Sequence, residues 1–266
     1  MIEALSLPLG QRRLLGVLVR RELAARHRAS LLGGLWFWLA PLLALTVYAF
    51  VFGGVMAARL PGQAEETGLA GFTLVLFGGL ALATFLNEVL ARAPGGVLAQ
   101  PNYVKKVVFP LHLLACIDVA VALVTLGASL AVIVSGTALL GSVPVTAVAL
   151  PLAVAPLVPM ALGLAWMVSA MGVYLRDLGS VVPPVLTALV FLAPVMYPRD
   201  AVPDGVRDWM LLNPLTVPVE QLRRVLFLGE WPDALALGLY AIVALVVYFA
   251  GFAMFRRLMK GFADVL

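Results

Sequence analysis

Six long apolar runs dominate this chain and restrict the folds that it can adopt. The runs cover Leu32–Met56, Leu69–Ala91, Leu111–Leu139, Val145–Val173, Val181–Met196 and Ala234–Phe255. A helix rises about 1.5 Å per residue, so about 20 residues cross a hydrocarbon layer about 30 Å thick. Apolar residues make up 63% of the chain and charged residues 12%, whereas soluble domains carry about 25% charged residues. The sequence predicts an all-α integral membrane protein with six transmembrane helices.

The fifth run is the shortest and contains Pro183, Pro184 and Pro194. Proline removes a backbone donor and breaks regular helix geometry. Broken backbone at membrane depth is tolerated where it is covered by protein or lines an aqueous cavity. We expect this run to be kinked, tilted or partly re-entrant.

The distribution of basic residues predicts the orientation of the chain. With the N-terminus inside, 13 of the 18 Lys and Arg residues lie on the cytoplasmic side, as the positive-inside rule requires. Both termini are therefore expected in the cytoplasm. The six arginines among the first thirty residues argue against a secretory signal peptide.

Two regions outside the spans show helical patterns. Residues 1–31 are predicted to hold a basic amphipathic helix that lies on the inner membrane face, before a six-span domain over 32–266. The outer segment 197–232 contains short helical patterns near Gly205–Leu212 and Pro218–Leu228. In the second pattern, Glu220 is expected to pair with Arg223 or Arg224.

A polar stretch, Gln100–Pro110, interrupts the apolar runs and includes Lys105 and Lys106. Hydrocarbon cannot solvate two adjacent ammonium groups, so this stretch belongs in water or at a headgroup surface. The chain contains no P-loop, CxxC, HExxH or GxSxG motif. We therefore expect no catalytic residues, no metal site and no cofactor on this chain. If ATP drives transport, a separate polypeptide hydrolyses it.

Ionisable groups near the inner ends of the runs allow two interpretations. Glu88 and Arg92 are spaced as an i,i+4 pair, and Asp118 lies two turns into the third run. These charges either neutralise one another and fix helix packing or belong to a proton relay, although two acids near one leaflet make an incomplete relay. Arg176-Asp177, after the fourth run, is either a membrane anchor or a docking element.

Aromatic residues gather in the first two runs. They suit either an interfacial belt or a track of apolar platforms for sugar rings. The track candidates are Trp36, Tyr48, Phe52, Phe72 and Phe85.

Several short strings, in this order, carry a family resemblance. They are Arg21-Glu22-Leu23, Ser30–Trp36, Val47–Gly53, Pro101–Pro110, Tyr174–Leu178, Ala193–Tyr197, Asn213-Pro214 and Gln221–Arg224. The chain resembles the membrane (permease) subunit of an ABC-2-type polysaccharide exporter, a group that moves O-antigen, capsule or teichoic acid. Its first outer loop, 57–68, is too short for a sizeable external domain. The pattern Pro101–Lys106 and the pair Arg176-Asp177 resemble O-antigen or teichoic acid exporters more than capsule exporters.

The resemblance implies a homodimer in the bacterial cytoplasmic (inner) membrane, bound to two copies of an ATPase subunit that carries Mg-ATP. The substrate would be a lipid-linked glycan. Segment 97–108 would couple the chain to the ATPase and segment 197–232 would gate the outer mouth. The implied ATPase-coupling residues are Pro101, Asn102, Tyr103, Lys105, Lys106, Arg176 and Asp177. The implied outer-gate residues are Asn213, Pro214, Leu222, Arg223 and Arg224.

Arg20, Arg21 and Arg28 are candidates for binding the carrier pyrophosphate, because guanidinium groups bind phosphate bidentately. Anionic lipid headgroups would satisfy the same residues. Three other functions remain open from the sequence: an ABC-2 permease for a drug or other small molecule, an ion-coupled flippase, and a membrane-embedded transferase. The flippase would require Glu88 or Asp118.

Overall fold

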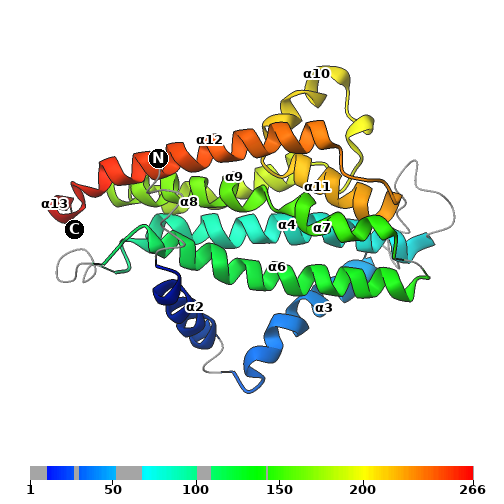
Figure 1. Cartoon of the computed structure of the whole chain (residues 1–266), viewed down its shortest axis with the longest axis horizontal. Helices are drawn as coiled ribbons and strands as arrows, with labels where there is room; N and C mark the ends of the chain where they lie inside the picture. Colours follow the sequence, from blue (N-terminus) through cyan, green and yellow to red (C-terminus); the bar gives the residue numbers. More distant parts are fainter. Residues whose placement is uncertain (1–10, 27–29, 52–67, 101–108, 142, 266) are drawn as a thin grey trace.

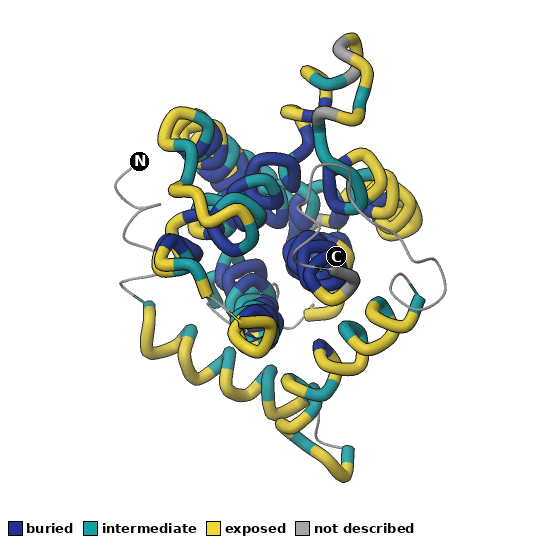
Figure 2. Tube along the Cα trace, turned by 90° about the vertical axis from the view of Figure 1, so that its right-hand side faces the viewer, coloured by how far each residue is buried: buried dark blue, intermediate teal, exposed yellow. Residues whose placement is uncertain are grey.

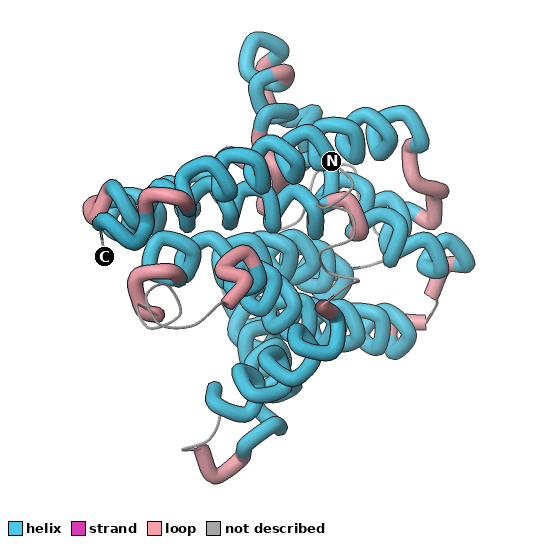
Figure 3. The backbone as a smooth tube through the Cα atoms, turned by 60° about the vertical axis from the view of Figure 1, so that its left-hand side comes forward, coloured by secondary structure: helices cyan, strands magenta, loops and turns pink. Residues whose placement is uncertain are grey.

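The computed structural model describes residues 11–26, 30–51, 68–100, 109–141 and 143–265. Within these ranges every regular element is a helix (Figure 3). The predicted coupling residues Pro101–Lys106, together with Arg28 and Phe52, lie outside the described residues.

Among the described residues, five helical segments are long and apolar enough to cross a membrane. They are Gly33–Val51, Ala70–Gly96, Leu113–Leu139, Val145–Tyr174 and Ala234–Met259. Their principal helices are α3 (Trp36–Tyr48), α4 (Gly68–Gly96), α6 (Leu113–Leu139), α8 (Leu157–Tyr174) and α12 (Ala234–Met259). The short elements nearby are η1 (Gly33–Leu35), η3 (Val145–Ala149), α7 (Leu150–Val154) and α13 (Phe262–Val265). The all-α membrane class is confirmed.

The fifth predicted span forms a shorter helix, α9 (Leu178–Leu192), with Pro183 and Pro184 inside its 15 residues. At about 1.5 Å per residue it is about 22 Å long, less than the hydrocarbon thickness of about 30 Å. Five helices of spanning length are thus present in the described ranges, and the count of six stays a prediction.

Helix α4 forms the axis of the bundle, with α6, α8 and α9 packed around it (Figure 1). Its side chains Leu82 and Val89 are fully buried, and Phe85 is 2% exposed. A helix that is apolar on all faces is expected to be surrounded by other helices. The structure meets this expectation most fully at α4.

Helices α8 and α12 touch through their backbones at a glycine pair. A Cβ at Gly163 would lie 2.5 Å from the carbonyl oxygen of Val247, and a Cβ at Gly251 would collide with the carbonyl of Gly163. Small residues permit such close approach in membrane bundles. Beside this contact, Trp166 packs against Phe252, with ring centroids 5.1 Å apart.

Helices α2 (Arg12–Arg26) and α3 diverge from the bundle on one side (Figure 1). Figure 2 shows both largely exposed, in contrast to the buried centre. On α3, Leu43 and Val47 are exposed, and Phe50, just beyond its end, is 68% exposed. This face is apolar, so it is suited to lipid or to another membrane chain.

The segment between α9 and α12 forms helices where the sequence predicts them. They are η4 (Arg199–Ala201), α10 (Asp204–Arg207), η5 (Trp209–Leu212), α11 (Thr216–Arg223) and the π-helical η6 (Arg224–Leu228). The α10 region projects from the side of the bundle, whereas α11 packs between the long helices (Figure 1). In α11, Thr216 is fully buried and Leu222 is 1% exposed.

Candidate functional site

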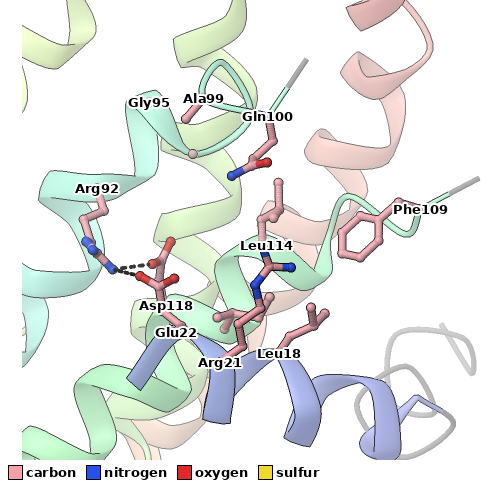
Figure 4. A pocket seen from close by; sticks show the side chains of 12 residues that line it. Leu18, Arg21, Glu22, Arg92, Gly95, Ala99, Gln100, Phe109, Leu114 and Asp118 are labelled. Carbon is pink, nitrogen blue, oxygen red and sulfur yellow. Dashed lines mark hydrogen bonds and ion pairs between the residues drawn. The ribbon is translucent and has the colours of Figure 1, made fainter. Parts of the chain in front are cut away.

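The base of the bundle is the end where α4 stops, α6 begins and α13 lies (left in Figure 1). Here the guanidinium of Arg92 on α4 contacts two carboxylates. Its Nη1 lies 3.2 Å from Oε1 of Glu22 on α2 and 3.1 Å from Oδ1 of Asp118 on α6 (Figure 4). One arginine therefore links three helices.

A second ion pair joins α2 to α4 one turn away. Nη1 of Arg26 lies 3.5 Å from Oε1 of Glu88. The expected pairing of Glu88 with Arg92 is wrong, because each residue binds a charge on α2 or α6 instead. An i,i+4 pair on a helix contributes only about 0.2–0.5 kcal/mol, so partners from a packed neighbour readily replace it. These charges do neutralise one another and hold helices together, as the first of the two interpretations requires.

A cavity of about 440 Å³ opens beside these ion pairs, between α2, α4 and α6. Arg21 and Gln100 reach into it, while Leu18, Leu114 and Phe109 form an apolar wall (Figure 4). No ion pair is recorded for Arg21 within the described ranges. The cavity thus combines an available cation with an apolar surface.

The candidate pyrophosphate residues are only partly brought together. Arg20 and Arg21 are both exposed on α2, and Arg21 lines the cavity. A guanidinium in this place can bind a phosphate-bearing headgroup. Arg28 lies outside the described residues.

Arg176 and Asp177 are exposed between α8 and α9, at the base as well. Tyr174, the last residue of α8, anchors the connection between α8 and α9. Its hydroxyl donates to the carbonyl oxygen of Leu258 at 2.8 Å. Its ring faces Phe262 of α13, with centroids 6.0 Å apart. The C-terminal helix therefore braces the connection that carries Arg176-Asp177.

His112 lies immediately before α6, close to Phe252 and Arg256 of α12. Burial lowers the pKa of its imidazole below 6.5, and the positive charge of Arg256 lowers it further. Its backbone oxygen accepts a hydrogen bond of 2.9 Å from Nε1 of Trp166. The imidazole is therefore neutral at pH 7, and the residue joins α6 to α8.

At the other end of the bundle, side chains cap the broken end of α9. Asn213 Nδ2 donates to the carbonyl of Leu189 at 2.7 Å, and Arg223 Nη2 donates to the carbonyl of Pro194 at 2.9 Å. The last four carbonyls of a helix have no intrahelical donor, and hydrocarbon supplies none. Asn213 thus satisfies a carbonyl in the last turn of α9, and Arg223 satisfies the carbonyl of Pro194 just beyond the helix.

The other predicted outer-gate residues lie in the same region. Leu222 packs so closely on α4 that a Cβ at Gly78 would lie 2.7 Å from it. Tyr240 of α12 donates to the carbonyl of Pro214 at 2.8 Å. Arg224 binds Glu230 at 2.9 Å, and the expected pairing of Glu220 with Arg223 or Arg224 stays a prediction. Burial lowers the pKa of Arg223, while the charge of Glu220 opposes that change.

The aromatic track residues separate into two groups. Phe72 and Phe85 are buried within this single chain. Trp36 and Tyr48 are half-buried on α3; Trp36 donates to the hydroxyl of Ser30 at 2.6 Å, and Tyr48 faces Phe77 at 6.4 Å. Among the four track residues that the structure describes, the α3 pair lies where a second chain or a substrate can reach it.

Sequence reasoning missed Glu22 and Arg26 as partners of α4. The matching spacing could have indicated the pairing, because α2 and α4 each carry an acid and an arginine four residues apart. Within the described ranges, no group of three or more His, Cys, Asp or Glu side chains is arranged to hold a metal ion.

Comparison with known proteins gives consistent matches along the chain. The O-antigen export system permease protein RfbA of Myxococcus xanthus is 30% identical over 256 residues, which cover 95% of each chain. A protein of the same name from Klebsiella pneumoniae is 24% identical over 95% of each chain. The polysialic acid transport protein KpsM of Escherichia coli is 25% identical over 89% of this chain and 90% of its own length.

The model of the ABC-2 type transporter family matches residues 13–227, from α2 through α11 and into η6. This range includes the ion pairs at the base and the capping contacts at the other end. The five apolar helices agree with a multi-pass protein of a bacterial inner membrane. The chain belongs to the ABC-2 type transporter family.

Proposed function

We propose that this protein is the channel-forming membrane subunit of an ATP-driven exporter that moves a lipid-linked polysaccharide out of the cytoplasm. The observation that carries the proposal is the match over 95% of the chain to permeases named for O-antigen export. A relative named for polysialic acid transport supports the broader class of glycan substrates. An O-antigen-like glycan is the proposed cargo.

The active assembly is proposed to contain two copies of this chain and two copies of a separate ATPase subunit that binds Mg-ATP. The lack of a P-loop in the sequence supports a separate ATPase. The uncovered apolar face of α3 supports pairing with a second copy. Trp36 and Tyr48 of α3 then face the path of the glycan, with Arg21 near its inner end.

The decisive experiment reconstitutes this chain with the proposed partner ATPase, in vesicles that contain a radiolabelled lipid-linked O-antigen. We expect export that requires ATP and that stops when the P-loop lysine of the ATPase is replaced. Export of a small-molecule drug without glycan export would overturn the proposal. Export by this chain alone, driven by an ion gradient, would also overturn it.

The contacts of the acids give the ion-coupled alternative no support. Glu88 and Asp118 are both engaged by arginines at the base, and a proton relay needs titratable groups that continue across the bilayer.

The predicted coupling residues have a separate test. Tyr103→Ala, Lys105→Ala and Lys106→Ala are combined, and binding of the ATPase is measured by co-purification. We expect the variant to insert normally and to lose the ATPase. The matched control Arg12→Ala removes an exposed charge from α2 and should keep the ATPase bound. Undiminished ATPase binding by the triple variant would refute the coupling role.

A further inference from the structure

The ion pairs between α2 and α4 form a ladder with two rungs. One rung is Glu22 with Arg92, at 3.2 Å, and the other is Arg26 with Glu88, at 3.5 Å. The two residues of each helix are four positions apart, or about one turn. On each helix the acid precedes the arginine along the chain. The two helices run in opposite directions at this contact, so each acid faces an arginine of the other helix. We call these four residues the charge ladder.

Alternating signs fix the position of α2 along its own axis. If α2 slides by four residues, about 6 Å, either Arg26 meets Arg92 or Glu22 meets Glu88. Both displaced positions place like charges together in a partly desolvated region, where repulsion is stronger than in water. Asp118 adds to the preference, since it binds the same Nη1 of Arg92 that Glu22 binds. The charge ladder therefore selects one register.

The charge ladder and Asp118 attach α2 to α4 and α6, the two helices that flank the coupling segment. α4 ends at Gly96 and α6 begins at Leu113, so residues 97–112 connect them. α2 packs against α6 and lines a cavity together with the end of α4 (Figure 4). α2 ends at Arg26 and α3 begins at Trp36. A displacement of the coupling segment thus has a direct route to the first span through α2.

We propose that the charge ladder is a positioning element of transport. It locks α2 in one register on α4 and α6, so that movement of the coupling segment is passed to α3. Glu22, Arg26, Glu88 and Arg92 are positioning residues, with Asp118 as the anchor on α6. This inference rests on the proposed function for its transport readout, whereas the register of α2 is measurable without it.

The transport test uses one broken rung and one exchanged rung. Arg26→Glu places two acids at one rung and is expected to lower glycan export per ATP hydrolysed by at least about fivefold, while the ATPase stays bound. The control Arg13→Glu makes the same charge change at an exposed position of α2 outside the ladder, and should leave the ratio unchanged. A normal ratio in Arg26→Glu would overturn the proposal.

The double variant Arg26→Glu with Glu88→Arg tests whether transport needs the fixed register of α2 or only the attraction between α2 and α4. It restores an opposite-charge rung, but it leaves α2 with two acids and α4 with two arginines, so sliding by four residues no longer brings like charges together. We expect α2 to bind the bundle again while export per ATP remains less than about half of normal. Full recovery of the ratio would show that attraction alone suffices and would overturn the register lock.

The register itself is measured on the permease alone. Spin labels at Val17→Cys on α2 and Val124→Cys on α6, with Cys116→Ser, report the distance between the helices. We expect one distance in the parent protein and two distances in the exchanged variant. A single unchanged distance in that variant would overturn the lock and leave the proposed function intact. If the parent protein shows no ATP-dependent glycan export, the proposed function is overturned, while the distance measurement still tests the register of α2.

Discussion

The two ends of the bundle are held together by different kinds of contact. At the base, α2 is attached by ion pairs between long side chains, and the side chain of Arg92 is 43% exposed. At the opposite end, Asn213 and Arg223 donate to backbone carbonyls in and just beyond the last turn of α9, and Asn213 is 6% exposed. Ion pairs in contact with water are weak and exchangeable. A buried carbonyl that loses its donor cannot replace it.

This difference indicates which end is built to move. The exposed ion pairs hold α2 in one register but contribute little free energy, so α2 can move together with the helices that it contacts. Removal of a buried cap, in contrast, leaves an unpaired backbone group. α2 is thus suited to transmit displacement. The α9–α11 contact is suited to keep its shape, and opening at that end is expected to move the two helices together.

The largest expected effect is at the capped end. Asn213→Ala removes the donor to Leu189 and the acceptor for the backbone N–H of Leu215. We expect a loss of about 2–4 kcal/mol in the free energy of unfolding, because each unpaired buried group costs about 1–3 kcal/mol. Thermal unfolding of the protein in lipid nanodiscs measures this loss. Arg224→Gln, which breaks only the exposed pair with Glu230, is the matched control. Equal stability of the two variants would remove the distinction between the ends.

A smaller effect is expected when the centre of the base network is removed. Arg92→Met leaves Glu22 and Asp118 without their shared partner. Solvent reaches all three groups, so the expected loss of stability is about 1 kcal/mol. The same unfolding assay measures it, and Arg12→Met is the control. A loss larger than that of Asn213→Ala would reverse the comparison.

Salt should distinguish the two ends without any mutation. Raising the ionic strength from about 0.01 M to about 1 M shortens the screening length from about 30 Å to about 3 Å. We expect hydrogen exchange at α2 to accelerate in high salt, because its ion pairs weaken. Hydrogen exchange in α11 should change little with salt, because the contacts of α11 are buried. Equal acceleration in both helices would contradict this difference.

The smallest predicted effect is a pH dependence at the base. The folded-state pKa of His112 is lowered from 6.5, so the folded protein favours the neutral imidazole. The resulting stability is fully present above about pH 6.5 and is lost as the pH falls through the lower folded pKa. His112→Gln should therefore reduce the fall in unfolding temperature between neutral and mildly acidic pH. An unchanged pH profile would show that other groups cause that fall.

Much of the architecture follows from the sequence because apolar length and charge placement act locally. The runs around α4, α6, α8 and α12 predict spanning helices, and the fifth run, the shortest of the six, forms the short helix α9. The short outer helices follow from helical spacing near Pro218–Leu228. Each of these features depends on residues close together in the chain.

Pairing between distant segments needed the folded structure. The sequence indicated that Glu88, Arg92 and Asp118 bear charges near the end of a bundle, but local spacing favoured the wrong pair. Nothing in the sequence indicated that Asn213 and Arg223 donate to carbonyls of Leu189 and Pro194. By itself, the sequence determined that the chain is an all-α membrane protein with charged ends and one short, proline-containing helix. Only the tertiary structure decided which charges meet and which side chains cap that helix, because these partners are brought together by helix packing and not by distance along the chain.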